Sequence, residues 1–108
     1  METNFGEYIR KLRTQNGWTL TQLGAKIGID SGALSKIETG KKEFDEELLS
    51  NLADAFNVDY EMLKSELISE KIAKKLYQYK CDDNVLTLAE QKVKYIRSKN
   101  TKQTILKF

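Results

Sequence analysis

The sequence predicts an all-α protein, and three observations support this class. Apolar residues recur at intervals of three and four along most of the 108 residues, the period of an amphipathic helix. The chain contains no proline, and 31% of its residues are charged. Asn, Asp, Thr and Gly, which favour helix ends, separate the periodic stretches. These features together predict helices from residue 5 to about residue 98.

The first helix is expected over about residues 5–16. Its apolar residues form one stripe: Phe5, Tyr8, Ile9 and Leu12. Asn4 and Glu7 have the spacing of a capping box, and Gly17 ends the helix. Trp18 is expected to pack between this helix and the next, because an indole among apolar neighbours is usually a core residue.

Two short helices are expected within residues 19–40. Thr19 with Gln22 makes a capping box for the first of them, and Gly28 supplies the left-handed residue that ends it. Ile29 anchors the turn on the core. The inner face of this helix consists of Leu20, Leu23, Gly24 and Ile27.

The second helix of this pair begins after a cap at Asp30 or Ser31, and Gly40 closes it. Leu34 and Ile37 face inward. Its outer face is left with Ser31, Gly32, Ser35 and Lys36. A helix, a short turn containing Gly and a second helix with a small polar outer face form a helix-turn-helix, whose second helix enters the major groove of DNA.

At this point the chain resembles the phage-repressor and Cro type of helix-turn-helix domain, the Xre group, over residues 5–63. The resemblance rests on three segments in the order and spacing of that family, IRKLRTQNGWT, LGAKIGID and LSKIETG. It implies a five-helix, lambda-repressor-like domain in residues 1–64 that binds double-stranded DNA and regulates transcription.

The resemblance also implies an ion pair between Arg13 and Glu38. A carboxylate near the core needs a partner, and an arginine fork would hold the first helix against the end of the recognition helix. The alternative is two separate surface charges of little energetic value.

The family pattern assigns DNA contacts residue by residue. Its base-contacting positions correspond to Ser31, Gly32, Ser35 and Lys36, among which Lys36 is the main candidate because lysine donates to guanine O6 and N7. Hydroxyls, amides and amines suited to phosphate oxygens lie at Thr19, Thr21, Gln22, Thr39, Lys41 and Lys42. The chain departs from the family at Leu20, where a glutamine usually contacts phosphate. Either Gln22 replaces that glutamine or the contact is absent.

Two further helices complete the expected domain. One begins at Asp45, places acids in its first turn and ends at Asn57. Its buried face comprises Leu48, Leu49, Leu52, Ala53 and Phe56. Asp59 caps the last helix, which turns Tyr60 and Leu63 inward.

Residues 65–98 are expected to form a helical hairpin, with helices over about 65–80 and 85–98. Its apolar stripes are wide enough to need a further surface, and we expect a second copy of the chain to cover them. The expected dimer contacts are Ile72, Leu76, Val93 and Ile96. The alternative is that the hairpin folds back on the domain. Residues 99–108 show no clear periodicity and are expected to form a mobile tail.

Charge is divided unevenly along the chain. Residues 1–64 hold 8 Lys and Arg against 11 Asp and Glu, a net charge of −3, whereas residues 65–108 hold 10 against 5, a net charge of +5. An acidic DNA-binding body must concentrate its positive charge locally, here at Lys36, Lys41, Lys42 and Lys11. The lysines of the extension either add to DNA binding or only maintain solubility.

Composition disfavours an enzyme. The chain has no histidine, one cysteine and scattered acids, so no catalytic residue, metal site or cofactor is expected. Cys81 has no partner for an internal disulfide, which favours a reducing cytoplasm. No run of about 18 apolar residues and no signal sequence is present, so a soluble protein without membrane contact is expected.

The sequence therefore predicts a homodimeric transcriptional regulator. One recognition helix reads too few base pairs to select a site in a genome. Two copies related by a two-fold axis would read an inverted repeat with half-site centres roughly 34–36 Å apart. Two alternatives are an antitoxin whose C-terminal helices bind a toxin while it represses its own promoter, and a helical interaction domain without DNA binding.

Overall fold

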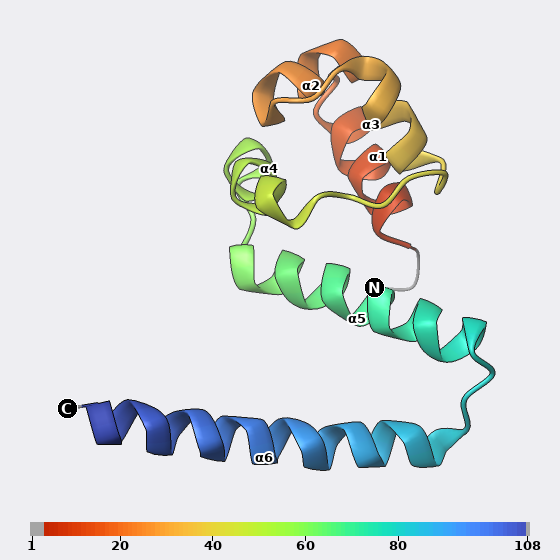
Figure 1. Cartoon of the computed structure of the whole chain (residues 1–108). Coiled ribbons are helices and arrows are strands. Elements are labelled where there is room, and N and C mark those ends of the chain that lie inside the picture. The colour runs from red at the N-terminus through yellow and green to blue at the C-terminus, as the bar shows by residue number, and fades with distance from the viewer. Residues whose placement is uncertain (1–3, 108) are drawn as a thin grey trace. The chain divides into compact units, whose positions relative to one another are not determined.

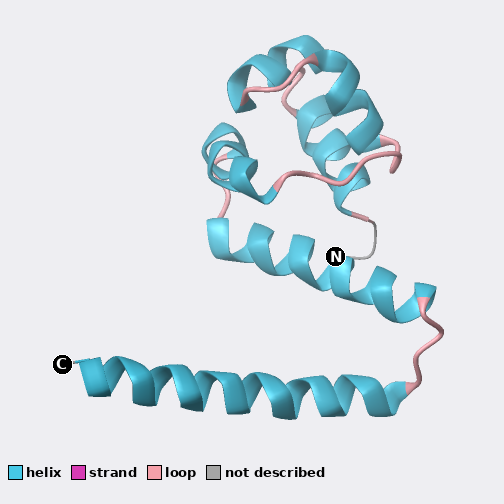
Figure 2. Cartoon of the chain, in the orientation of Figure 1, coloured by secondary structure: helices cyan, strands magenta, loops and turns pink. Residues whose placement is uncertain are grey.

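The computed structural model describes residues 4–107, and describes side chains over residues 4–100. Within these residues every regular element is a helix and no strand occurs, so the predicted all-α class is confirmed (Figure 2). The elements are α1 (Phe5–Gln15), α2 (Leu20–Ile27), α3 (Ser31–Glu38), the 3-10 helix η1 (Glu46–Leu48), α4 (Leu49–Phe56), α5 (Tyr60–Gln78) and α6 (Asp83–Lys107) (Figure 1). No helix in this range combines the length and apolarity that a bilayer crossing needs.

Side-chain caps begin the first three helices at the predicted positions. The Asn4 side chain accepts a hydrogen bond from Glu7 N at 2.9 Å. Glu7 Oε1 accepts from the Asn4 side-chain amide at 3.2 Å, so the capping box predicted for α1 is only half formed. Thr19 and Gln22 form a reciprocal capping box on α2, and Asp30, rather than Ser31, caps α3 by accepting from Ala33 N at 2.7 Å. Each cap satisfies a backbone N–H that the helix itself leaves unpaired.

The core is a single cluster of apolar side chains from α1 to α5 and the loop before η1. Within it α3 packs against α1 and α2, and α2 also packs against α4. Trp18, partly buried, stacks on Phe56 with ring centroids 5.7 Å apart, so it packs on α4 as well as beside α1 and α2. The buried members are Phe5, Ile9, Leu23, Ile27, Leu34, Ile37, Phe44, Leu49, Leu52, Ala53, Leu63 and Leu67.

The helix expected to begin at Asp45 differs from the prediction in its first turn. Residues Glu46–Leu48 form η1, and α4 begins only at Leu49. The Asp45 carboxylate accepts from Glu47 N, two residues ahead, at 2.9 Å. The caps of α1 to α3 accept from a residue three positions ahead, and the shorter reach at Asp45 matches the tighter turn of a 3-10 helix.

The predicted fifth helix and the first helix of the predicted hairpin are one continuous helix, α5. The expected break near residue 64 is therefore wrong. No Gly, Pro or Asn interrupts Tyr60–Gln78, and Leu63 and Leu67 continue one buried face across the position of the expected break.

Contacts of α5 extend the first compact unit to Ile72, past the boundary expected at residue 64. Glu70 Oε1 accepts from Phe5 N, the first amide of α1, at 3.0 Å. Lys71 Nζ lies 2.9 Å from Glu46 Oε1 of η1. The pKa of Tyr8 is raised by burial and by the nearby Glu66 carboxylate. The middle of α5 therefore belongs to the same folded unit as α1.

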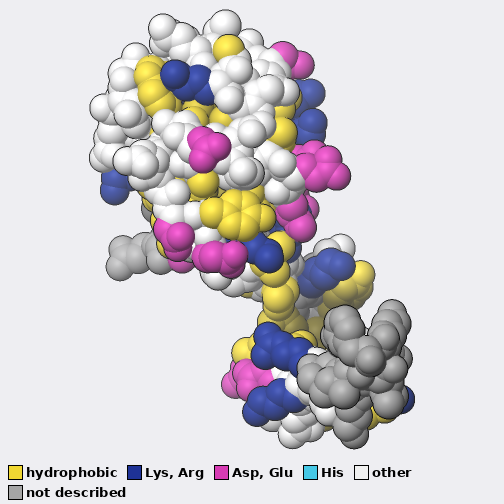
Figure 3. Space-filling view, turned by 90° about the vertical axis from the view of Figure 1, so that its left-hand side faces the viewer, with side chains coloured by type: hydrophobic (Ala, Val, Ile, Leu, Met, Phe, Trp, Pro, Cys, Tyr) yellow, Lys and Arg dark blue, Asp and Glu magenta, His cyan; other side chains and the backbone are white. Residues whose placement is uncertain are grey.

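The second unit begins at Ala73 and contains α6. This helix continues beyond the predicted end at residue 98 to Lys107, so residues 99–107 are helical where a tail was expected, and residue 108 lies outside the described residues. Every described side chain of α6, over residues 83–100, is exposed. Hydrophobic and basic side chains lie together on the part of this helix in view in Figure 3.

Candidate nucleic-acid interface

The turn between α2 and α3 has little freedom. Gly28 has φ of 89°, which an L side chain rarely adopts. The amides of Gly28 and Ile29 both donate to the carbonyl of Gly24, at 2.8 and 3.0 Å. A Cβ atom on Gly24 would collide with the carbonyl oxygen of Ile29. Gly24 and Gly28 therefore fix the orientation of α3 relative to α2.

The faces of α3 divide as the sequence predicts. Leu34, Ile37 and Glu38 are buried. Of the four predicted base-contacting residues, Ser31, Gly32 and Lys36 are exposed, and Ser35 is half-buried. The exposed face carries small side chains near the start of the helix and one long cation near its end, so the α3 backbone is accessible to a large partner.

Two lysines are held beside the C-terminal end of α3. The carbonyl of Lys36 accepts from the amides of Lys41 and Lys42, at 2.8 and 3.3 Å. Gly40, with φ of 79°, turns the chain back to make these bonds. Both lysine side chains are exposed, and the negative end of the α3 dipole favours cations there. The loop thus holds the backbone of Lys41 and Lys42 against the end of α3, with both side chains on the exposed surface.

Thr39 is less suited to contact phosphate than its position suggests. Its hydroxyl donates to the carbonyl of Ser35 at 2.9 Å and lies 3.3 Å from that of Lys36. A phosphate oxygen needs a donor, and this hydroxyl proton is already engaged within α3. A contact through Thr39 would require breaking that bond.

The start of α2 keeps two donors available. Gln22 Oε1 accepts from Thr19 N at 2.8 Å, and Thr19 Oγ1 accepts from Gln22 N at 3.1 Å. These bonds leave the Gln22 amide hydrogens and the Thr19 hydroxyl proton for a ligand, and Thr21 is exposed beside them. Leu20, where the family places a glutamine, packs against the core instead.

The implied ion pair between Arg13 and Glu38 is present. Arg13 Nε donates to Glu38 Oε2 at 2.7 Å, and Nη2 donates to Oε1 at 3.0 Å. A third bond runs from Nη1 to the carbonyl of Trp18 at 2.9 Å. The hydrogen bonds that Arg13 donates to Glu38 raise the pKa of Arg13; burial lowers this pKa, and the negative charge of the carboxylate raises it further. The pair ties the end of α1 to the end of α3.

Gly6 is a structural residue that sequence reasoning missed. A Cβ atom there would collide with the carbonyl oxygen of Ile37, so glycine lets α1 approach the backbone of α3 closely. The available signal was a glycine inside an otherwise good helix, which often marks a close packing contact. Together with the ion pair, this contact positions the recognition helix.

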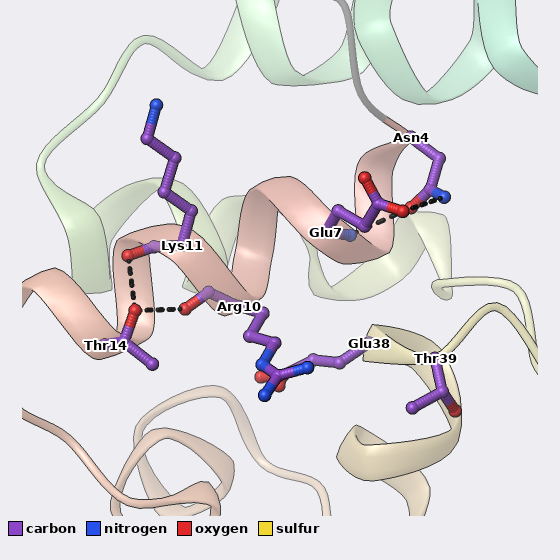
Figure 4. A pocket seen from close by; sticks show the side chains of 7 residues that line it. All are labelled: Asn4, Glu7, Arg10, Lys11, Thr14, Glu38 and Thr39. Atoms are coloured by element: carbon purple, nitrogen blue, oxygen red, sulfur yellow. Dashed lines mark hydrogen bonds between the residues drawn. The ribbon is translucent and has the colours of Figure 1, made fainter.

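A groove of about 500 Å³ lies between α1 and the end of α3 (Figure 4). It is lined by Asn4, Glu7, Arg10, Lys11, Thr14, Glu38 and Thr39. The side chain of Lys11 extends away from Glu38 and Thr39 in this view. The Glu38 carboxylate at the base of this groove is already paired with Arg13, which leaves Glu7 as the unpaired acid beside Arg10 and Lys11 among the lining side chains. Thr39 is the one predicted phosphate contact among its lining residues, so the groove lies at the margin of the candidate interface.

Comparison with known proteins adds a family match. The model of the family described as Helix-turn-helix (HTH_3) matches residues 9–63. The chain is 34% identical over 82 residues to the HTH-type transcriptional repressor RghR of Bacillus subtilis (strain 168). The aligned region covers 72% of this chain and 61% of that protein. The chain thus spans about three-fifths of the length of that repressor.

Three similar solved structures cover 55%, 56% and 86% of this chain. The restriction-modification controller protein C.AhdI from Aeromonas hydrophila is 27% identical with a TM-score of 0.50, over 55% of this chain and 86% of that one. The P22 c2 repressor, solved with a synthetic operator, is 28% identical with a TM-score of 0.52, over 56% and 92%. The SinR/SinI protein complex, at 20% identity and a TM-score of 0.50, covers 86% of this chain and 97% of the matched chain, and shows likeness of fold alone.

Proposed function

This chain belongs to the Xre/Cro-C1 type of helix-turn-helix family, a family of non-enzymatic DNA-binding regulators, and from that premise we propose that it is a repressor that reads DNA through α3. The observation that carries the proposal is the exposed polar face of α3 with Lys41 and Lys42 bonded to its C-terminal end. On this proposal Lys36 would lie against base edges, and Lys41 and Lys42 would lie along the phosphates.

The proposed division of roles starts from Lys36. Its side chain is exposed on α3 and would donate to guanine, while Ser31, Ser35 and the backbone at Gly32 would contact neighbouring bases. Thr19, Thr21, Gln22, Lys41 and Lys42 would contact phosphates on either side, and Thr39 is the weakest of the predicted phosphate contacts because of its internal hydrogen bond.

Two lysine substitutions test this division. Lys36→Ala is expected to cost about 1–3 kcal/mol on the preferred site and to relax preference at one base pair. Lys42→Ala is expected to weaken all sequences alike and to reduce the salt slope of binding by about one. Binding is measured by fluorescence anisotropy on a site selected from random DNA and on scrambled DNA, over a salt series.

Lys64→Ala is the matched control, because Lys64 is an exposed lysine on α5, outside the proposed interface. The Lys64→Ala variant is expected to change neither the affinity for the selected site nor the salt slope of binding. Equal losses for Lys36→Ala and Lys42→Ala on selected and scrambled DNA would contradict the placement of α3 in the groove.

We propose that the active form is a homodimer whose contacts include Ile72, Leu76, Val93 and Ile96. Support comes from exposure: among the described residues, nine of the ten exposed large hydrophobic side chains lie between residues 72 and 96. Ile72, Val93 and Ile96 are among these nine, whereas Leu76 is half-buried. An exposed apolar stretch of this kind in a soluble chain marks an interaction surface. The dimer would read an inverted repeat with half-site centres about 10–10.5 base pairs apart.

Truncation tests the dimer. The cut belongs after Ile72 rather than after Lys64, because Leu67 is part of the core. The shortened chain is expected to fold, to sediment as a monomer and to lose about a hundredfold in affinity for the inverted repeat, because its two half-sites no longer act together. A shortened chain that dimerises and binds at full strength would move the interface to α4 and α5.

Recovery of the full chain in fixed ratio with one unrelated protein would support the antitoxin function instead.

A further inference from the structure

The exposed face of α6 contains one stripe without charge. We call Leu86, Ala89, Val93 and Ile96 the α6 seam. Leu86, Val93 and Ile96 are each about half exposed, at 47%, 43% and 55%. Their intervals of three, four and three residues match the a and d positions of a heptad, the pattern of helices that pair along their length.

The neighbouring apolar side chains of α6 are less suited to pairing. Leu88 and Tyr95 lie on an adjacent face that also carries lysines, because Lys92 and Lys99 fall between them and the seam on the helix surface. Lys99 Nζ lies 5.7 Å from the centroid of the Tyr95 ring, where it covers part of that ring. The seam is therefore the uncharged surface that a second helix would bury.

The intervals of three, four and three residues in the α6 seam are the same when counted from either end of the helix, so two copies of the seam can align antiparallel. When a second α6 runs antiparallel about a two-fold axis near residue 91, Leu86 faces Ile96 of the copy and Ala89 faces Val93 of the copy. Every seam residue then meets an apolar residue, and each small side chain meets a branched one, which suits close packing.

Charge along α6 distinguishes the two possible orientations. Within residues 83–100 the acids are Asp83 and Glu90, and the cations Lys92, Lys94, Arg97 and Lys99 all follow them. In the antiparallel pair Asp83 flanks Arg97 of the copy, and symmetry gives this attraction twice. In a parallel pair Arg97 would instead flank Lys92 of the copy, which is repulsive twice.

The antiparallel pair also has unfavourable contacts near its axis. Glu90 meets Glu90 of the copy on one edge, and Lys92 meets Lys92 of the copy on the other. These side chains are exposed, so water and salt screen the repulsion. The antiparallel pair thus balances two attractions against two repulsions, whereas the parallel pair has two repulsions and no attraction.

From this pattern we infer that α6 of one chain pairs antiparallel with α6 of a second copy, with the α6 seam buried and Asp83 beside Arg97 of the copy. The inference rests on the homodimer of the proposed function and gives that dimer its orientation. The seam spans about 16 Å of helix, so part of the contact area is expected to come from Ile72 and Leu76 of α5.

Charge reversal in the full chain tests the orientation. Arg97→Asp and Asp83→Arg are each expected to weaken the dimer about tenfold in sedimentation equilibrium, because two attractive pairs become repulsive. The double variant restores opposite charges and is expected to recover the original affinity. A parallel pair gives the opposite result for Arg97→Asp, which would tighten the dimer by removing repulsion from Lys92.

Cysteine cross-linking provides a second measurement that does not depend on charge. In a chain with Cys81→Ser, Ala89→Cys alone and Val93→Cys alone are expected to form no intermolecular disulfide. Residue 89 is displaced from residue 89 of the copy by about 6 Å along the helix, in addition to the separation of the helices. A mixture of the two variants is expected to cross-link. Efficient cross-linking of either variant alone would overturn the antiparallel arrangement.

The outcomes separate this inference from the proposed function. A dimer with the parallel signature overturns the orientation but leaves the homodimer and its DNA binding intact. A full chain that is monomeric up to high concentration overturns both the seam and the homodimer, even when it binds DNA. The Lys36→Ala and Lys42→Ala measurements bear on α3 alone and do not depend on either result.

Discussion

Replacing Glu38 by alanine is expected to lower the free energy of unfolding by about 3–5 kcal/mol. The Glu38 side chain is 4% exposed and that of Arg13 is 13% exposed, so the substitution leaves a guanidinium nearly buried and without its carboxylate. The loss is measured by urea denaturation followed by circular dichroism, with the dependence on urea concentration compared between variants.

Two controls identify the source of that loss. The double variant Arg13→Met with Glu38→Leu removes both charges and is expected to recover most of the stability, because well-packed apolar residues can replace a buried ion pair. Glu46→Ala removes the ion pair with Lys71. The Glu46 side chain is 55% exposed, so this substitution is expected to lower the free energy of unfolding by less than about 1 kcal/mol. A loss below about 0.5 kcal/mol in Glu38→Ala would contradict the buried position of the pair.

Leu67→Ala is expected to destabilise the domain by about 2–5 kcal/mol, the usual cost of a cavity in a packed core. Leu67 is 2% exposed although it lies beyond the domain boundary expected at residue 64. The same urea titration measures the effect. Tyr77→Ala, in the same helix but at an 88% exposed position, is the matched control and is expected to change stability little. Equal effects of the two substitutions would separate the middle of α5 from the core.

Much of the first unit could be predicted because its signals are local. A cap such as Asp30 and the left-handed Gly28 act within a few residues, and the apolar stripes of α1 to α4 have a regular period. The buried face of α3 followed from the same periodicity. The pair between Arg13 and Glu38 required a resemblance, because its members are 25 residues apart and no spacing rule links them.

The missed features depend on tertiary contacts or on the absence of a stop signal. The expected break near residue 64 follows the extent of the family resemblance and the change of net charge there. Neither of these ends a helix, and Leu67 continues the stripe of Leu63. The collision that a side chain on Gly6 would make involves the backbone of α3, which the sequence does not reveal. Beyond residue 98 α6 continues without an apolar stripe, because lysine and glutamine favour helix without one.

The exposure of α6 also bears on how long the protein persists in a cell. A helix without a buried side chain over residues 83–100 is held by its own backbone hydrogen bonds, and such helices open readily in water. Proteases cleave segments that open. Pairing with a second copy would close this segment and slow cleavage, so the turnover of the proposed regulator would fall as its concentration rises. Abundance and lifetime would then reinforce each other, and the transition between the repressed and released states of its operator would be sharper than DNA binding alone provides.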